Sequence, residues 1–361
     1  MPRRSICLAL ILALASLGCS DHIVTLDAPS DVQVERIVPS MAKVGRRVVL
    51  IGTTNKGDLV RTEISGKKGI VTRIGDSGKD VIDAAEEAEG KGDEGTQWNV
   101  GWTGITFGPD GVLYTLSRTG VDPRADGCEP SGPNSQSTAC SRLYSVNPEA
   151  AAIIADHGVF RSASSNDEGS TYVSDVDFDG TVFGVNRFKV SGGAFGLISV
   201  QTDGTLFFDR RDTEFGDPGI GRTVDNGGLS FDPTTCTWWS VDNGFSVPPA
   251  LFKIDPATGL ASNGVLLKDG INFGFSGLEI TQNGRVFFSR SFEEFQIYEL
   301  ANRKSGRIRQ ITLDVDPTIQ GKLNGLEEFV ASPEPPNCDE PPKSGKSDKS
   351  GKSDKSKRSG K

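Results

Sequence analysis

The chain has 361 residues, a formal net charge of −9 and many turn-forming residues, with 44 Gly and 19 Pro. Its length allows one large domain or two ordinary ones. Residues 343–361 carry seven Lys, one Arg and two Asp, so residues 19–342 hold a net charge of about −17. An acidic body argues against nucleic acid as a partner and is compatible with cations.

The N-terminus has the composition of a secretory signal. Arg3 and Arg4 precede an apolar run that ends in small residues, so we expect residues 1–18 to be removed and the body to be exported. The mature protein would be secreted, periplasmic or associated with the cell surface. No later segment approaches the roughly 20 apolar residues of a transmembrane helix.

The end of this signal, "SLGC", resembles a bacterial lipobox, which would make Cys19 the lipidated first residue of the mature protein. Ser16 departs from that pattern because Leu is usual there. Cleavage after Ala15 or Gly18 without lipidation is the alternative, so anchored and free forms both remain open.

Four cysteines follow the signal, and an even number in an exported chain favours disulfides. Cys128 and Cys140 form the best pair because they close a polar loop. Cys236 and Cys338 are the remaining candidates. Since there is no CxxC and no nearby His, a zinc site is not expected.

A repeat organises the middle of the chain. Five segments share a beginning, with an alternating strand that runs into a turn and, except in the last segment, a second strand. They start at Gly104, Asp175, Gly228, Gly277 and Gly325, spaced by 71, 53, 49 and 48 residues. A second shared phrase supplies two more strands. Four-stranded antiparallel units at this period predict an all-β fold, a β-propeller with five blades.

The last repeat explains how the ring closes. Residues 46–76 contain the second, third and fourth strands of a blade without a first, whereas 324–332, "NGLEEFVAS", begin a blade and stop. We predict that this C-terminal strand completes the N-terminal blade and so removes open sheet edges. An open solenoid is the alternative, and residues 31–40 with parts of 80–98 are candidates for a sixth blade.

These patterns divide the chain into segments. The predicted propeller covers 46–331, preceded by a linker at 19–45 and followed by a Pro-rich linker at 332–342. Residues 343–361 contain no apolar residue and predict a disordered basic tail. A flexible cationic tail favours a polyanionic surface or extracellular polymer as its partner.

The repeats resemble those of exported β-propellers of the broad LYxIDPxTG type, which includes lactonase-like, NHL and phytase-like proteins. The best copy is "LFKIDPATG" at 251–259. The resemblance implies the fold but does not choose an activity, because one fold carries many functions.

One aligned position carries chemistry. Its five members each follow an apolar residue, so strand alternation places them on one face: Thr106, Asp177, Ser230, Glu279 and Glu327. If that face points to the propeller axis, the three carboxylates converge, and oxygen ligands of this kind suit calcium. The alternative is a wet channel in which these side chains bond to water and to Ser230 or Thr106.

Other catalytic patterns are weak. The chain has only His22, beside the signal, and His157, and it lacks GxSxG, which argues against a Ser/His/Asp triad. Residues 175–180, "DVDFDG", begin like a calcium loop, but Asn186 stands where such a loop needs Glu. We expect the adjacent Trp238 and Trp239 to pack between blades.

The sequence therefore predicts an exported, monomeric, non-catalytic binding or surface-associated module, with calcium as the one cofactor that its residues suggest. The alternative is a divalent-metal-dependent hydrolase, lactonase- or phosphoesterase-like, in which Asp175, Asn226 and Asn324 would join the axial Glu residues at the channel mouth.

Overall fold

A computed structural model describes part of the chain. It covers residues 47–54, 56–76, 102–108, 111–117, 142–159, 161–162, 173–189, 192–200, 206–225, 227–242, 248–268, 275–290, 295–329 and 338. The signal with Cys19, the Cys128–Cys140 loop, the candidate sixth blade and the basic tail lie outside the described residues. Within those ranges, no helix has the length and hydrophobicity that a membrane span requires.

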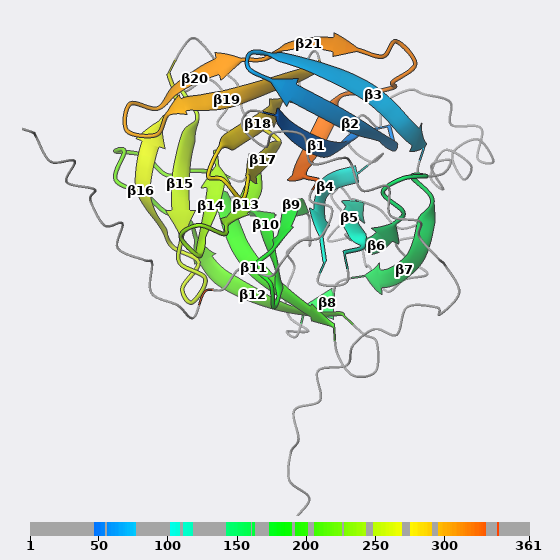
Figure 1. The fold of residues 1–361 in the computed structure, drawn as a ribbon. Coiled ribbons are helices and arrows are strands. Elements are labelled where there is room, and N and C mark those ends of the chain that lie inside the picture. Colours follow the sequence, from blue (N-terminus) through cyan, green and yellow to red (C-terminus); the bar gives the residue numbers. More distant parts are fainter. Residues whose placement is uncertain are drawn as a thin grey trace, which may run out of the picture.

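Five four-stranded antiparallel sheets form a ring, which is a five-bladed β-propeller (Figure 1). Blade 1 contains β22 (Leu323–Glu328), β1 (Arg47–Thr54), β2 (Asp58–Ser65) and β3 (Lys68–Asp76). Blade 2 contains β4 (Trp102–Phe107), β5 (Leu113–Ser117), β6 (Arg142–Val146) and β7 (Ile153–Val159). Blade 3 contains β9 (Val173–Phe178), β10 (Phe183–Lys189), β11 (Gly192–Val200) and β12 (Leu206–Glu214). Blade 4 contains β13 (Leu229–Asp232), β14 (Thr237–Val241), β15 (Ala250–Ile254) and β16 (Ala261–Leu266). Blade 5 contains β17 (Gly277–Ile280), β18 (Val286–Arg290), β19 (Gln296–Asn302) and β20 (Arg307–Gln310). The predicted fold class and blade number are confirmed.

The ring closes through the C-terminal strand. β22 pairs antiparallel with β1, so that Ile51 lies opposite Glu327 and Gly52 lies opposite Leu326. In Figure 1 the orange β22 lies beside the dark-blue β1, although the two strands are distant in sequence. The predicted closure is confirmed, and the inner edge of β1 is paired rather than open.

The inner strands approach one another closely because four of them have a glycine at or near their start: Gly104, Gly228, Gly277 and Gly325. A Cβ atom at Gly228 would lie 2.3 Å from the Leu278 backbone nitrogen of blade 5, and one at Gly277 would lie 2.3 Å from the Asn324 carbonyl oxygen of blade 1. Neither neighbour can yield, because both are backbone atoms. These glycines let the strands approach at the axis, as the repeat alignment predicts.

Each of five hydrophobic cores lies between two adjacent blades. Trp238 packs with Phe195 and Phe231 between blades 3 and 4, whereas Trp239 packs with Phe275 and Leu278 between blades 4 and 5. Adjacent residues of a strand point to opposite faces, so the Trp pair contributes to two different cores. Both indoles are buried, and their predicted packing role is confirmed.

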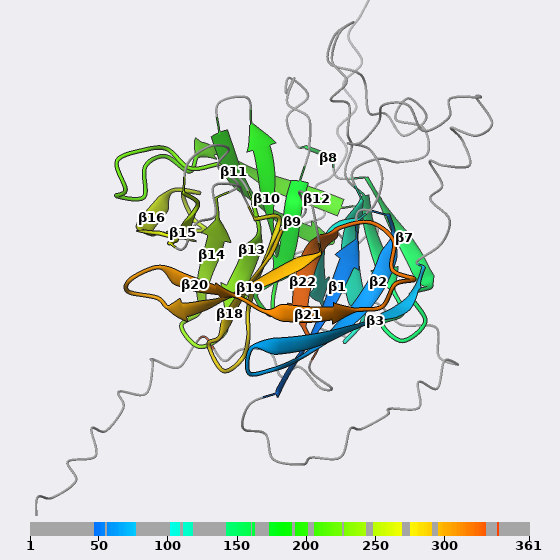
Figure 2. The same cartoon turned by 90° about the horizontal axis from the view of Figure 1, so that it is seen from above.

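Two short strands that the sequence did not predict extend the outer edges of blades. β8 (Arg161–Ser162) follows β7 and adds in parallel to β12 of blade 3, and β21 (Thr312–Val315) follows β20 and adds in parallel to β3 of blade 1. Both views show β21 running along β3 (Figures 1 and 2). A parallel bridge from Lys268 to Arg307 repeats the pattern between blades 4 and 5. The chain therefore ties a blade to the next at the outer edge as well as at the axis.

One disulfide is present among the described cysteines. Cys236, in the turn between β13 and β14, is bonded to Cys338, and their Cα atoms are 5.6 Å apart. The two cysteines that remained after the predicted Cys128–Cys140 pair thus pair with each other. The bond attaches Cys338 to blade 4.

Candidate metal centre

The inner strands bring the three predicted carboxylates together. Asp177 on β9, Glu279 on β17 and Glu327 on β22 each offer an oxygen atom, and these oxygens all lie within 4.8 Å of one another. Two oxygens bound to one calcium ion at 2.3–2.6 Å can lie up to about 5 Å apart. The spacing therefore accommodates a single ion between three blades.

Hydrogen bonds between neighbouring inner strands hold the side chains at the aligned position of the repeat. Asp177 Oδ2 accepts the backbone N–H of Phe231 at 2.5 Å, and its Oδ1 accepts the hydroxyl of Thr106 at 2.8 Å. Ser230 Oγ accepts the backbone N–H of Ile280 at 2.9 Å. Each of these bonds joins a side chain of one blade to a neighbouring blade.

The two glutamates continue this arrangement around the axis. Glu279 accepts a hydrogen bond from the backbone of Glu328, and Glu327 accepts one from the backbone of Phe107. At four of the five aligned positions, the side chain accepts the N–H of the residue that follows the aligned position in the next blade. Thr106, the fifth, donates to Asp177 instead. We call this arrangement the axial ring; it contains Thr106, Asp177, Ser230, Glu279 and Glu327.

The axial ring carries negative charge that no side chain of the described residues neutralises. Asp177 and Glu279 are 7% and 4% exposed, and Glu327 is partly buried. Among the described residues, no Lys or Arg forms an ion pair with any of the three. Buried like charges at this range favour either protonation or a bound cation.

The pKa values follow from this environment. Burial raises the pKa of Asp177 to about 6, against the lowering effect of its bonds from Phe231 and Thr106. Burial, followed by the charge of Asp177, holds the pKa of Glu279 well above its usual value. Burial and the charge of Glu279 do the same for Glu327. Unless the three carboxyl groups share a cation, the ionisation of one therefore disfavours the ionisation of the others.

Asp175 is a further buried acid beside the axial ring. It stands where the other four blades have glycine, and its Oδ2 accepts the Leu229 N–H at 2.8 Å. Burial raises its pKa well above the usual value. Asp179, by contrast, lies in the β9–β10 turn, where its Oδ1 accepts the N–H groups of Thr181 and Val182 at 2.8 and 2.9 Å. Residues 175–180 therefore form a strand end and a turn that Asp179 closes.

The remaining candidates lie elsewhere. His157 is on β7, the outer strand of blade 2, with its ring 5.5 Å from that of Tyr114. Asn226 lies outside the described residues. Glu328, which sequence reasoning missed, accepts the Gln282 N–H at 2.7 Å and has its pKa raised by burial. Its proximity to Glu327 in sequence was the only signal, and alternation places it on the other face of β22.

The fold and the site define a five-bladed β-propeller with an acidic axis. No protein-family model matches the chain, and no curated protein matches it. Similar solved structures include a glutaminyl cyclase from Myxococcus xanthus, at 13% identity over 63% of this chain and 80% of that chain, with a TM-score of 0.38. A putative 6-phosphogluconolactonase from Bacteroides fragilis has 8% identity over 74% and 82%, with a TM-score of 0.38. A nidogen/laminin complex has 11% identity over 79% and 99%, with a TM-score of 0.40. Such low similarity supports no statement about activity.

Proposed function

We propose that this protein is an exported, non-catalytic binding module whose propeller axis holds a structural calcium ion. The observation that carries the proposal is the double role of the axial ring. The carboxylates that converge to within 4.8 Å also accept backbone N–H groups from the next blade. An ion held by Asp177, Glu279 and Glu327 would tie blades 3, 5 and 1 together at the place where the inner strands already meet.

The ligand chemistry favours calcium over other common ions. All three ligands are carboxylates, and the cluster contains no His or Cys, which zinc prefers. Magnesium requires oxygens at 2.0–2.1 Å in near-ideal octahedral geometry, whereas calcium accepts longer and less regular contacts. Buried carboxylates with raised pKa values regain their charge when a divalent cation is bound.

The test is a set of thermal melts of the full-length protein in calcium, in magnesium and in EDTA. Because an ion that binds only the native state stabilises it, calcium should raise the melting temperature increasingly with concentration. Glu279→Gln should abolish this increase, whereas Glu149→Gln, which changes an exposed glutamate of blade 2, should retain it. Equal melting temperatures in calcium and EDTA would refute the proposal.

One observation favours a hydrolase as the second candidate. Glu327 is the least buried of the three carboxylates, so an ion at this site would have one ligand near solvent. A metal-bound water beside such a carboxylate is the arrangement that metal-dependent hydrolysis needs. Metal-dependent turnover of a lactone or a phosphate ester that Glu327→Gln abolishes, without loss of fold, would establish the hydrolase and exclude the non-catalytic role.

Export is supported by the disulfide, because such bonds persist in oxidising compartments. We infer that the module acts outside the cytoplasm, and that the basic tail adds attraction to polyanionic surfaces.

A further inference from the structure

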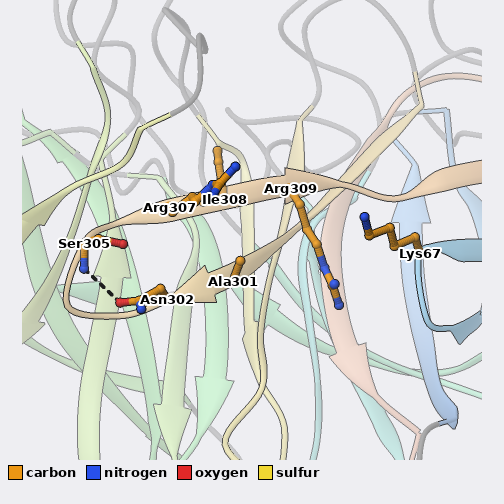
Figure 3. A pocket seen from close by; sticks show the side chains of 7 residues that line it. All are labelled: Lys67, Ala301, Asn302, Ser305, Arg307, Ile308 and Arg309. Carbon is orange, nitrogen blue, oxygen red and sulfur yellow. Dashed lines mark hydrogen bonds between the residues drawn. The ribbon is translucent and has the colours of Figure 1, made fainter.

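A second site lies on the outer edge of the propeller, where blades 5 and 1 meet. An open hollow of ≈ 510 Å³ lies between the β19–β20 hairpin and the turn between β2 and β3. Its lining consists of Lys67, Ala301, Asn302, Ser305, Arg307, Ile308 and Arg309. Figure 3 shows Lys67 beside Arg309, with Asn302 and Ser305 at the tip of the hairpin. We call this hollow the edge pocket.

The edge pocket is cationic in an acidic protein. Three of its seven lining residues are Lys or Arg and none is acidic, whereas the whole chain has a net charge of −9. Exposed Lys68 and Lys304 are adjacent to lining residues in sequence. Glu299, which binds Arg309 from β19, is also shared by Arg285. The lining therefore favours an anionic ligand, although the chain as a whole is acidic.

The walls of the edge pocket are held in place by hydrogen bonds. The carbonyl oxygen of Lys67 accepts the N–H of Thr312 at 2.9 Å, which ties the β2–β3 turn to β21. Asn302 Oδ1 accepts the N–H of Ser305 at 3.0 Å, which fixes the hairpin tip. The unpredicted strand β21 thus places Lys67 of blade 1 opposite the β19–β20 hairpin of blade 5.

Arg309 is oriented in advance. Its Nε and Nη2 atoms donate to Glu299 Oε2, with the Nε contact at 2.8 Å. This pair leaves the Nη1 donors of the planar guanidinium for another acceptor. A fixed guanidinium loses little conformational freedom when its remaining donors bind a carboxylate or phosphate.

The mixture of lining groups indicates the chemistry of the ligand. The Lys and Arg side chains can bind an acidic group of the ligand. Asn302 and Ser305 can form hydrogen bonds with hydroxyl groups, and Ala301 and Ile308 provide a small apolar surface. The volume is in the range of small-molecule sites. Nucleic acids are bound largely through a row of phosphate contacts along the backbone, which three cations in one pocket do not offer.

We propose that the edge pocket binds an acidic sugar unit of an anionic polysaccharide, with Lys67, Arg307 and Arg309 supplying the positive charge that attracts it. This inference deepens the proposed binding role by assigning it a site and a ligand class. It does not depend on the axial ring, so calcium binding and polysaccharide binding can fail separately.

The experiment is calorimetric titration of the full-length protein with a galacturonic acid trimer, with monomeric galacturonate and with neutral maltotriose. We expect the trimer to bind, maltotriose not to bind, and both Lys67→Glu and Arg307→Glu to weaken trimer binding at least five-fold. Lys56→Glu is the matched control, since it makes the same charge change in an exposed turn at the opposite end of β2. It should change binding less than two-fold. The tail is present in every variant, so its contribution is constant.

The outcomes are decisive in both directions. Unchanged binding in Lys67→Glu and Arg307→Glu, equal weakening by Lys56→Glu, or equal binding of maltotriose would overturn the proposal. Pocket-dependent binding of a single-stranded oligonucleotide without binding of the trimer would overturn it in favour of nucleic acid. Binding of the monomer as tightly as the trimer would identify a free sugar acid as the source of the ligand, still within the proposed chemistry. Calcium stabilisation of the same variants should match that of the wild type.

Discussion

At the scale of single residues, the axial ring has two opposing effects on the stability of the fold. Its hydrogen bonds join the blades, while its uncompensated carboxylates repel one another. Asp177 illustrates the balance, because four hydrogen-bond donors contact it and burial still raises its pKa to about 6 from 3.8. A shift of that size corresponds to about 3 kcal/mol at neutral pH. A bound cation would convert this destabilising contribution into a stabilising one.

This balance predicts that the difference in stability between Glu279→Gln and the wild type depends on pH, and that it changes sign when calcium is added. The folded pKa of Asp177 exceeds its unfolded value, so in EDTA its ionisation destabilises the fold fully above pH about 6 and not at all below 3.8. Glu279→Gln removes one of the repelling charges. In EDTA at pH 8 the variant should therefore melt several degrees above the wild type, and the difference should vanish by about pH 4.

In saturating calcium at pH 8 the order should reverse, because the variant lacks a ligand. Melting temperatures measured between pH 4 and 8, with Glu149→Gln as the control for an exposed position, test both parts. A variant that is less stable than the wild type in EDTA at pH 8 would show that Glu279 contributes mainly through its hydrogen bond to blade 1.

Much of this site could be predicted, and the reason is alternation. The aligned position placed Asp177, Glu279 and Glu327 on one face, and the propeller geometry brings such faces together at the axis. The backbone donors could not be predicted, since any residue can supply an N–H and only the stagger of neighbouring blades decides which one does. The edge pocket was missed for a related reason: Lys67 and Arg307 belong to different repeats and become neighbours only through β21.

At the scale of elements, strands that belong to the sequence repeat can be predicted, whereas strands outside the repeat cannot. β22 could be assigned to blade 1 because residues 46–76 lacked a first strand. β8 has two residues and β21 has four, and neither belongs to the phrases that the repeats share, so only the closed ring shows their partners. The Cys236–Cys338 bond has the same origin, because the β13–β14 turn and the segment after β22 meet only in the closed propeller.

The disulfide should contribute to stability through the length of chain that it encloses. It joins residues that are 102 positions apart, for which loss of the link is expected to lower the free energy of unfolding by about 2–5 kcal/mol. Cys236→Ser, Cys338→Ser and the double variant should all lose the same amount, because each removes the whole link. Denaturant unfolding measures this. Additive losses in the double variant would mean that the bond is absent in the mature protein.

At the scale of the whole molecule, the propeller is a closed circle of shared cores. Every hydrophobic cluster takes residues from two blades, so no blade buries its apolar faces alone. The axial ring links the blades at the centre, and β8, β21 and the disulfide link them further out. Such an arrangement should unfold as one unit. We expect the stability of every blade to depend on closure by β22.

Two truncations test this dependence on closure. A chain that ends at residue 342 keeps β22 and Cys338, and its melting temperature should equal that of the full-length protein. A chain that ends at residue 322 loses the buried Leu323 and Leu326, worth roughly 2–5 kcal/mol each, and leaves the inner edge of β1 unpaired. It should lose its cooperative transition and aggregate.

Full-length Cys338→Ser separates the two effects of the shorter truncation, because it lacks the disulfide and keeps β22. Calorimetry and size-exclusion chromatography of the three proteins give the comparison. If the chain that ends at 322 melted cooperatively at the temperature of Cys338→Ser, closure would contribute nothing beyond the disulfide. If the chain that ends at 342 melted lower than the full-length protein, the basic tail would be part of the folded unit. We expect neither, because the cores of blade 1 depend on β22 and residues 343–361 contain no apolar side chain to bury.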